Sequence, residues 1–192
     1  MLIRLGLLVL LGAIVLGVPA ALAASVKEPA YTVISREDDL ELREYAPLIR
    51  AETVVQGPYK ESLNDGFRIL ADYIFGGNAG SRKIAMTAPV GAEATDAGWR
   101  VSFVMPAEYT LDTLPRPLDP RVTLREVPAH RVAALRFRGW AGEADVEERK
   151  AELARAMARQ GLEAAGEPVV AQYNPPWTVP FLRRNEILVE IR

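Results

Sequence analysis

Lys83-Ile84-Ala85-Met86-Thr87-Ala88-Pro89-Val90 is the stretch on which our prediction of the fold depends. It follows a segment, residues 59–75, whose apolar side chains recur every three or four positions, as on one face of a helix. We expect residues 83–90 to form a strand that leads through a long loop into an apolar strand at 99–105. The same order of helix, proline-bearing segment and strand returns in residues 143–191. The chain therefore resembles one structural unit used twice.

The offset between equivalent residues supports this duplication. Leu42-Arg43-Glu44 and Leu124-Arg125-Glu126 are separated by 82 positions, and Gly57 and Gly139 keep the same separation. The last strands of the two units match at an offset of about 86. We predict pseudo-repeats at about 31–106 and 121–192, joined by a proline-rich linker at 114–120. The expected fold class is α+β, a twisted, mainly antiparallel β-barrel or sheet with two flanking helices.

The N-terminus has the pattern of an export signal. Arg4 precedes an apolar run of about 14 residues, shorter than the roughly 20 that span a membrane, and Ala21-Leu22-Ala23 fits a cleavage site. We predict a cleaved signal peptide at 1–23 and one mature domain at 24–192, periplasmic or secreted, with no stable membrane span. The alternative is an uncleaved anchor.

Composition excludes several classes of site. The chain has no cysteine, which excludes disulfides, thiolate metal sites and covalently attached haem. A single histidine excludes a multi-histidine zinc site. The formal net charge of −2 gives no support for nucleic-acid binding. We expect a monomer.

Several spaced motifs resemble the SOUL haem-binding protein family over about residues 28–192. The matching segments are residues 83–90, Phe103-Val104-Met105-Pro106, Pro115-Arg116-Pro117, residues 173–177 and Arg183-Arg184-Asn185-Glu186-Ile187. The resemblance implies a twisted barrel of two repeats with two helices. It also implies reversible, non-covalent binding of haem or another tetrapyrrole by a carrier, buffer or scavenger that is not an enzyme.

The resemblance also directs the choice of candidate residues. Family members place a pocket along the first helix and the late proline loop, and a tetrapyrrole needs an apolar cleft, cations for its propionates and an optional iron ligand. The candidates for contact with the macrocycle and its propionates are Leu63, Phe67, Leu70, Ala71, Met86, Trp177, Phe181, Arg183 and Arg184. His130 is the candidate iron ligand. Family members that use a histidine in the first repeat have it where this chain has Glu44, so that role does not transfer.

Each candidate also has an ordinary structural interpretation. The helical stripe and Met86 fit a hydrophobic core, Trp177 and Phe181 fit a cover over the end of the barrel, and one arginine is expected to pair with Glu186. His130 fits an exposed turn, in which case a methionine or Tyr45, Tyr73 or Tyr173 is left as a possible iron ligand.

Two other functions remain open at this point. The fold also resembles GyrI-like small-molecule-binding domains, some of which hydrolyse ligands with a buried Glu and a Tyr, and Glu44 or Glu126 would take that role here. The third hypothesis is a protein-interaction module anchored by Trp177.

Overall fold

A computed structural model of the chain describes residues 26–192, and the predicted signal peptide lies outside the described residues. This region forms nine strands, two α-helices and one short 3-10 helix. In chain order they are β1 (Tyr31–Glu37), β2 (Leu40–Tyr45), β3 (Leu48–Val55), α1 (Tyr59–Phe75), β4 (Val90–Thr95), β5 (Gly98–Val104), β6 (Thr123–Val127), β7 (His130–Phe137), α2 (Glu143–Arg159), β8 (Val169–Gln172), η1 (Pro180–Leu182) and β9 (Asn185–Glu190).

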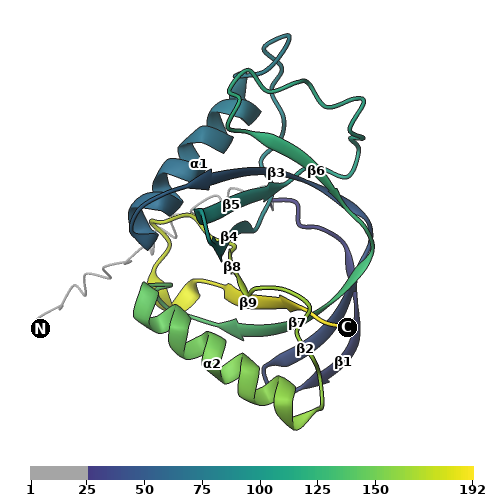
Figure 1. Cartoon of the computed structure of the whole chain (residues 1–192), viewed down its shortest axis with the longest axis vertical. Helices are drawn as coiled ribbons and strands as arrows, with labels where there is room; N and C mark the ends of the chain where they lie inside the picture. Colours follow the sequence, from purple (N-terminus) through teal and green to yellow (C-terminus); the bar gives the residue numbers. More distant parts are fainter. Residues whose placement is uncertain (1–25) are drawn as a thin grey trace, which may run out of the picture.

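The nine strands make one antiparallel sheet that curls into a half-barrel (Figure 1). Its order is β1-β2-β7-β9-β8-β4-β5-β3-β6. Apart from β1, the sheet is pseudo-symmetric about the β8–β4 pair. Strands β4, β5, β3 and β6 follow one another on one side of the centre, and their equivalents β8, β9, β7 and β2 follow in the same order on the other side. We call β4, β5, β3, β6 and α1 the α1 half, and β8, β9, β7, β2, β1 and α2 the α2 half. The α+β fold with two pseudo-symmetric units is confirmed.

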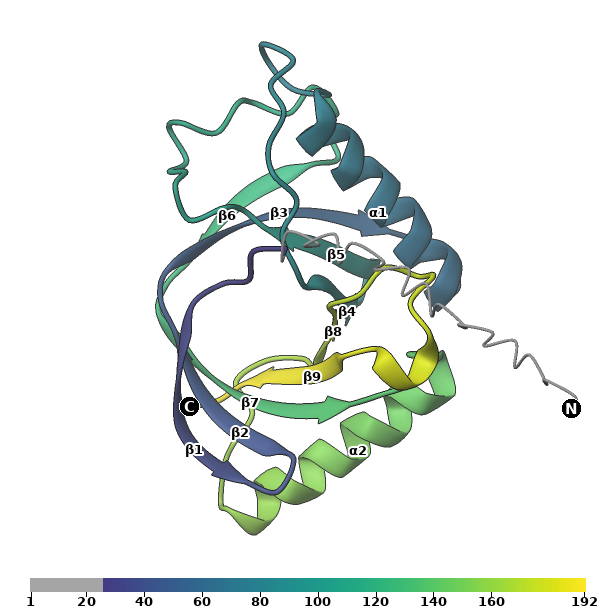
Figure 2. The ribbon, with the colours of Figure 1, turned by 180° about the vertical axis from the view of Figure 1, so that it is seen from behind.

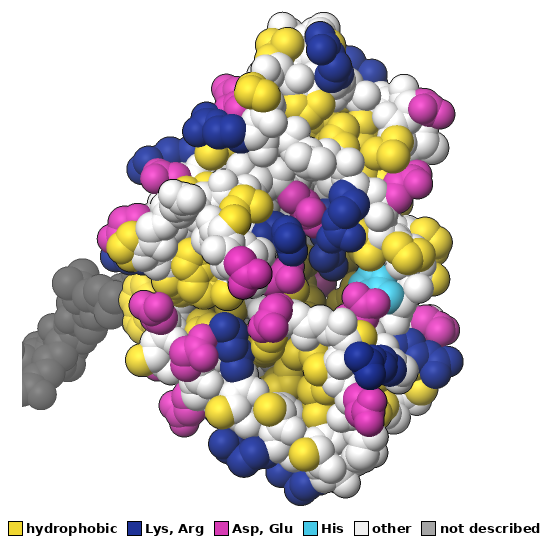
Figure 3. Space-filling view, in the orientation of Figure 1, with side chains coloured by type: hydrophobic (Ala, Val, Ile, Leu, Met, Phe, Trp, Pro, Cys, Tyr) yellow, Lys and Arg dark blue, Asp and Glu magenta, His cyan; other side chains and the backbone are white. Residues whose placement is uncertain are grey.

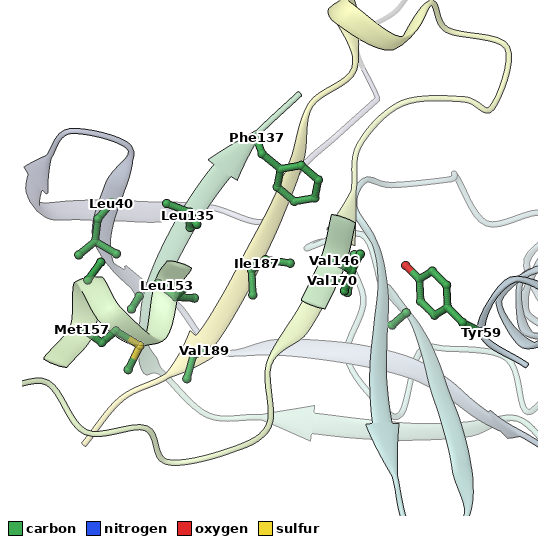
Figure 4. Packing of buried hydrophobic residues seen from close by; sticks show 13 residues of the cluster. Leu40, Tyr59, Leu135, Phe137, Val146, Leu153, Met157, Val170, Ile187 and Val189 are labelled. Carbon is green, nitrogen blue, oxygen red and sulfur yellow. The ribbon is translucent and has the colours of Figure 1, made fainter. Parts of the chain in front are cut away.

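The two helices pack on the outer face of the curled sheet and leave its inner face open (Figures 1 and 2). Side chains alternate between the two faces of a strand. On β3, Ala51 belongs to the core under α1, whereas Arg50 and Glu52 on either side of it line the hollow of the half-barrel. The core is accordingly in two parts, one under each helix, and Figure 4 shows the part under α2.

Gly66 allows α1 to lie close to the sheet. A Cβ atom at this position would be 2.5 Å from Cγ2 of Val101 on β5, which is too close for two non-bonded carbon atoms. Phe67 packs beside it with its ring edge toward Phe103, at 5.4 Å between centroids. The helix face that the sequence predicted as an apolar stripe is thus held tightly against β3 and β5.

The prediction of a strand at 83–90 is wrong for all but its last residue. Strand β4 begins at Val90, and the residues before it run as an extended segment with one isolated bridge, between Lys27 and Thr87. Their hydrogen bonds go elsewhere, because the Ile84 amide donates to the Ile74 carbonyl and the Thr87 hydroxyl donates to the Val104 carbonyl. This segment connects the end of α1 to the sheet.

The long loop expected between 90 and 99 is also absent. Strands β4 and β5 pair from Val90↔Phe103 to Thr95↔Gly98, so only two residues turn the chain. Gly98 has φ of +126°, and a Cβ there would lie 2.4 Å from the Val55 carbonyl oxygen. The long irregular segment follows β5 instead and leads to β6.

Candidate ligand-binding site

The inner face of the half-barrel encloses a cavity of about 350 Å³. Figure 3 shows acidic and basic side chains gathered around the hollow in the middle of this face. The charged side chains that line it are Arg50, Glu52, Glu93, Arg100, Arg125, Glu167 and Glu190, and His130 lies in the same wall. Val132, Val169 and Leu188 supply an apolar lining on the α2 half.

Most of the inner charges in this cavity are paired. Glu52 accepts two hydrogen bonds from Arg125, from Nε at 3.1 Å and from Nη2 at 2.7 Å. Glu93 accepts one from Nη1 of Arg100 at 2.9 Å. The hydrogen bonds to Glu52 raise the pKa of Arg125 above its ordinary value. These pairs leave little uncompensated charge on β4, β5 and β6.

Arg50 differs from these arginines. Within residues 26–192 its guanidinium makes no hydrogen bond or ion pair, although Glu52 and Arg125 lie near enough to influence it. Burial lowers the pKa of Arg50 below its ordinary value. A guanidinium stays protonated in proteins, so the cavity contains a partly desolvated positive charge.

A second hollow, of about 830 Å³, adjoins this cavity. It is a groove between residues 27–30, the β2–β3 connection and the segment after β5, and it contains Thr87, Met105, Pro106 and Tyr109. Pro29, Leu48 and Val104 line both hollows. The groove and the cavity are therefore adjacent, and the groove is mostly apolar whereas the cavity is lined by charged side chains.

The α2 half contains a different, sealed ion pair. Arg43 donates to both oxygens of Glu186, at 2.6 and 3.0 Å, and both side chains are almost fully buried. Tyr173 and Arg184 also donate to Glu186. Burial alone would raise the pKa of Glu186, but hydrogen bonds from Arg43 and its charge outweigh burial and hold the pKa below the ordinary value.

Three of the four candidates on α1 pack into the protein core. Leu70 is fully buried, Phe67 packs on the core under α1, and Leu63 packs on the core under α2. Ala71 is half-buried. None of the four lines the cavity or the groove. The structural interpretation of this stripe fits the packing.

The candidates in the β8–β9 connection lie outside both hollows. Trp177 and Phe181 are 82% and 68% exposed. Arg183 donates to the Thr178 and Pro176 carbonyls of the same loop and stacks on Trp140 at 4.1 Å. The hydrogen bonds to the two carbonyls stabilise the conformation of the loop.

Arg184 is also engaged within the protein. Its Nη1 contacts the Glu28 carboxylate at 3.0 and 3.1 Å, and its Nε donates to Glu186 at 3.0 Å. Its guanidinium lies 3.7 Å from the Tyr173 ring centroid. Both arginines that were predicted to bind propionates thus have partners inside the chain.

His130 lies apart from the exposed loop, and Met86 lines neither hollow. His130 begins β7, and the opposite end of that strand, Phe137, pairs with Asn185 beside the loop. Seven residues of extended chain separate the two ends by roughly 23 Å. Met86 is 37% exposed in the segment before β4. The structure therefore does not bring the ten candidates together.

His130 is held in the cavity wall in a defined orientation. Its Nδ1 is 2.8 Å from the Pro128 carbonyl oxygen, and its ring stacks on Tyr45 with 5.5 Å between centroids. Because a carbonyl only accepts, Nδ1 carries the proton in this hydrogen bond, and in the neutral imidazole Nε2 then has a free lone pair. Metal-bound histidines are commonly held by their second nitrogen in this way.

The sequence analysis missed the charged inner face of the α1 half. Residues 48–52 alternate apolar and charged side chains at Ile49, Arg50, Ala51 and Glu52, a pattern that indicates one buried and one polar face. The pattern alone does not show that the polar face curls into a cavity. That depends on the curvature of the whole sheet.

The arrangement required for a hydrolase is not found at the predicted carboxylates. Glu44 and Glu126 are exposed, and Glu44 pairs with Arg131 at 3.4 Å. Glu186 is buried beside a tyrosine, but its lowered pKa keeps it ionised. In the described part of the chain, no group of three or more His, Asp or Glu side chains is placed to hold a metal ion, and no helix is long and apolar enough to cross a membrane.

Comparison with known proteins adds a family match. The model of the SOUL heme-binding protein family matches residues 26–190. Heme-binding protein 1 of Sus scrofa is 30% identical over 139 residues, which cover 68% of this chain and 71% of the relative.

Solved structures show the same fold at low sequence identity. The crystal structure of the EcmrR C-terminal domain superposes with a TM-score of 0.62 at 12% identity and covers 84% of this chain and 98% of that one. A hydrolase from Listeria innocua superposes with a TM-score of 0.55 at 12% identity, covering 83% and 94%. At these identities the likeness concerns the fold alone.

Proposed function

The chain belongs to the SOUL haem-binding protein family, and from this premise we propose that it binds haem or a related tetrapyrrole non-covalently in the hollow of the half-barrel. The observation that supports this site is that the groove adjoins the charged cavity and shares Pro29, Leu48 and Val104 with it. A tetrapyrrole has an apolar macrocycle and carboxylate substituents, so it needs a space with these two characters. The groove volume of about 830 Å³ lies within the range of ligand sites.

His130 is the residue proposed to contact iron. It lines the cavity wall, and Pro128, which holds its Nδ1, lines the adjoining groove. An imidazole nitrogen is a common axial ligand for haem iron. When bound, haem would supply an iron centre with an open coordination position, and the protein would bind it and limit its contact with solvent.

The proposed role is that of a carrier, buffer or scavenger in the bacterial envelope, acting as a monomer and without catalysis. The predicted signal at 1–23 supports this location. Mass measurement of the protein recovered from a periplasmic extract tests it, because cleavage after Ala23 would leave Ala24 as the first residue.

Titration of the purified protein with haemin, followed by absorbance, tests the function. We expect a saturable one-to-one complex with a shifted haem band, and we expect His130→Ala to change the band. Metal-free protoporphyrin IX in parallel shows whether iron contributes to affinity. Absence of saturable binding of either compound would refute the proposal.

The exposed aromatic loop favours a second candidate, a protein-interaction module. Trp177, Phe181 and Leu182 are all more than 60% exposed, and exposed apolar patches often mark interaction sites. This candidate predicts that Trp177→Ala abolishes binding of a protein partner and leaves haemin binding unchanged.

A further inference from the structure

The hollow contains one charged side chain that the protein itself does not satisfy. Among its inner arginines, Arg125 is paired with Glu52 and Arg100 with Glu93. Arg50 lies on β3 opposite Arg125 on β6 and, within the described chain, has no hydrogen-bonding partner. Arg50 is partly exposed, so solvent reaches its guanidinium, and an anion that enters the hollow can bind it without displacing a partner from the chain.

The acidic residues near Arg50 do not supply that partner. The carboxylates of Glu52 and Glu93 are occupied by Arg125 and Arg100. Glu167 and Glu190 line the same cavity but are exposed, where solvent screens their charge. The charge in the hollow that no neighbouring side chain pairs with is therefore the positive charge of Arg50.

A guanidinium is suited to a particular class of anion. Its planar fork matches the two oxygens of a carboxylate, and such hydrogen bonds are stronger than those between neutral groups. Arg50 and Leu48 are two positions apart on β3, so their side chains emerge on the same face about 6 to 7 Å apart. Leu48 is one of the residues at which the apolar groove begins.

From this placement we propose that Arg50 binds a carboxylate of an amphipathic ligand whose apolar body occupies the adjoining groove. This inference rests on the proposed function in so far as the ligand is a tetrapyrrole, whose short propionate would span the distance from groove to cavity. The protein would then select ligands that have a carboxylate close to an apolar body, and Arg50 would bind this carboxylate in place of Arg183 or Arg184.

A pair of ligands that differ only in charge tests the inference. The probes are protoporphyrin IX and its dimethyl ester, titrated into the wild type, Arg50→Val and Arg68→Gln. Valine is the residue at the equivalent position of the other half, Val132. Arg68 is an exposed arginine on α1 outside the hollow, so its substitution controls for net charge.

We expect Arg50→Val to bind the diacid about tenfold more weakly or worse than the wild type, as lost hydrogen bonds to a charged group predict. It should bind the ester as the wild type does, and Arg68→Gln should match the wild type with both. Equal affinity of wild type and Arg50→Val for the diacid would overturn the inference. Equal affinity of the wild type for diacid and ester would do the same.

Two further measurements distinguish a loss of carboxylate binding from misfolding of Arg50→Val and from failure of the proposed function. Thermal unfolding of Arg50→Val should show no loss of stability, because the substitution removes an unpaired charge; an unfolded variant would contradict that view of Arg50. If neither porphyrin binds the wild type, the proposed function fails, and fluorescence titration with 1-pyrenebutyrate tests the carboxylate site alone. Binding that is lost in Arg50→Val would keep the inference, and no binding to the wild type would overturn it.

Discussion

The two halves of the sheet have an arginine at equivalent positions, but one of the two side chains is buried and the other is exposed. Arg43 on β2 and Arg125 on β6 are equivalent by the offset of 82, and each extends over the inner face of its half. In the α2 half the acidic partner is Glu186 on β9. The equivalent position on β5 is occupied by Arg100. The strand register shows this equivalence: Arg100 is opposite Val54 on β3 and Glu93 on β4, and Glu186 is opposite Arg136 on β7 and Ala171 on β8.

The acidic partner in the α1 half has moved to another strand. Glu52 on β3 occupies the position equivalent to Ala134 on β7, and it accepts the hydrogen bonds of Arg125. The side chains of Arg43 and Glu186 are 2% and 1% exposed, whereas Arg125 is 45% exposed. One half thus encloses its ion pair in the interior, and the other keeps a charged surface that a ligand can reach.

Removing the acidic residue from each half should show this difference most strongly. We expect Glu186→Ala to lower the free energy of unfolding by about 3–5 kcal/mol, because it leaves Arg43 buried without a partner. The loss from Glu52→Ala should be smaller, about 1–2 kcal/mol, since its partners reach solvent. Urea denaturation at pH 7 measures both, and equal losses would mean that the two sites do not differ in burial as described.

Lowering the pH should reduce the free energy of unfolding through protonation of Glu186, as Glu186→Ala does, but by a smaller amount. The pKa of folded Glu186 lies below its ordinary value of 4.5, so the unfolded chain binds more protons in this interval. The stabilisation from ionised Glu186 is therefore present above about pH 4.5 and is lost as the pH falls toward the lowered pKa. Arg43, Arg184 and Tyr173 face this carboxylate and lose a charged partner on protonation.

The measurement is the difference in unfolding free energy between wild type and Glu186→Gln from pH 7 to pH 3. We expect the difference to shrink as the pH falls below about 4.5, since glutamine resembles the protonated carboxyl. A difference that stays constant across this range would show that Glu186 does not titrate with a lowered pKa.

A rearranged α1 half should recover part of its stability. In Glu52→Ala, Arg125 and Arg100 are left facing each other without the carboxylate between them. Adding Arg100→Glu reproduces the arrangement of Arg43, Ala134 and Glu186 in the other half. We expect the double variant to be more stable than Glu52→Ala by about 1 kcal/mol, measured by urea denaturation.

Arg68→Gln added to Glu52→Ala is the matched control, because it removes one positive charge away from the hollow. No gain from Arg100→Glu beyond this control would mean that the equivalence of the two halves does not extend to side-chain geometry.

The sequence predicted the fold better than the site, and residues in α1 and β3 show why. Leu63, Phe67 and Leu70 repeat along one helical face, and this local pattern was sufficient to place α1 at residues 59–75. Arg50 and Glu52 also form a local pattern, yet their role depends on β4, β5 and β6 curling around them. A motif resemblance directed attention to Arg183 and Arg184. The expected pairing of one arginine with Glu186 is confirmed for Arg184, but the bonds of Arg183 to carbonyls of its own loop depend on the folded loop.

The smallest expected effect concerns the aromatic loop, which the sequence placed at the ligand-binding rim. Trp177 is 82% exposed and belongs to neither hollow, so Trp177→Ala should change the free energy of unfolding by no more than about 0.5 kcal/mol. Haemin affinity should change less than twofold if the ligand lies in the half-barrel. A tenfold loss in Trp177→Ala, with Arg50→Val unaffected, would instead place the tetrapyrrole at the outer loop, because only there does the indole contact it. The comparison of these two variants therefore decides between the hollow of the half-barrel and the β8–β9 loop as the binding site.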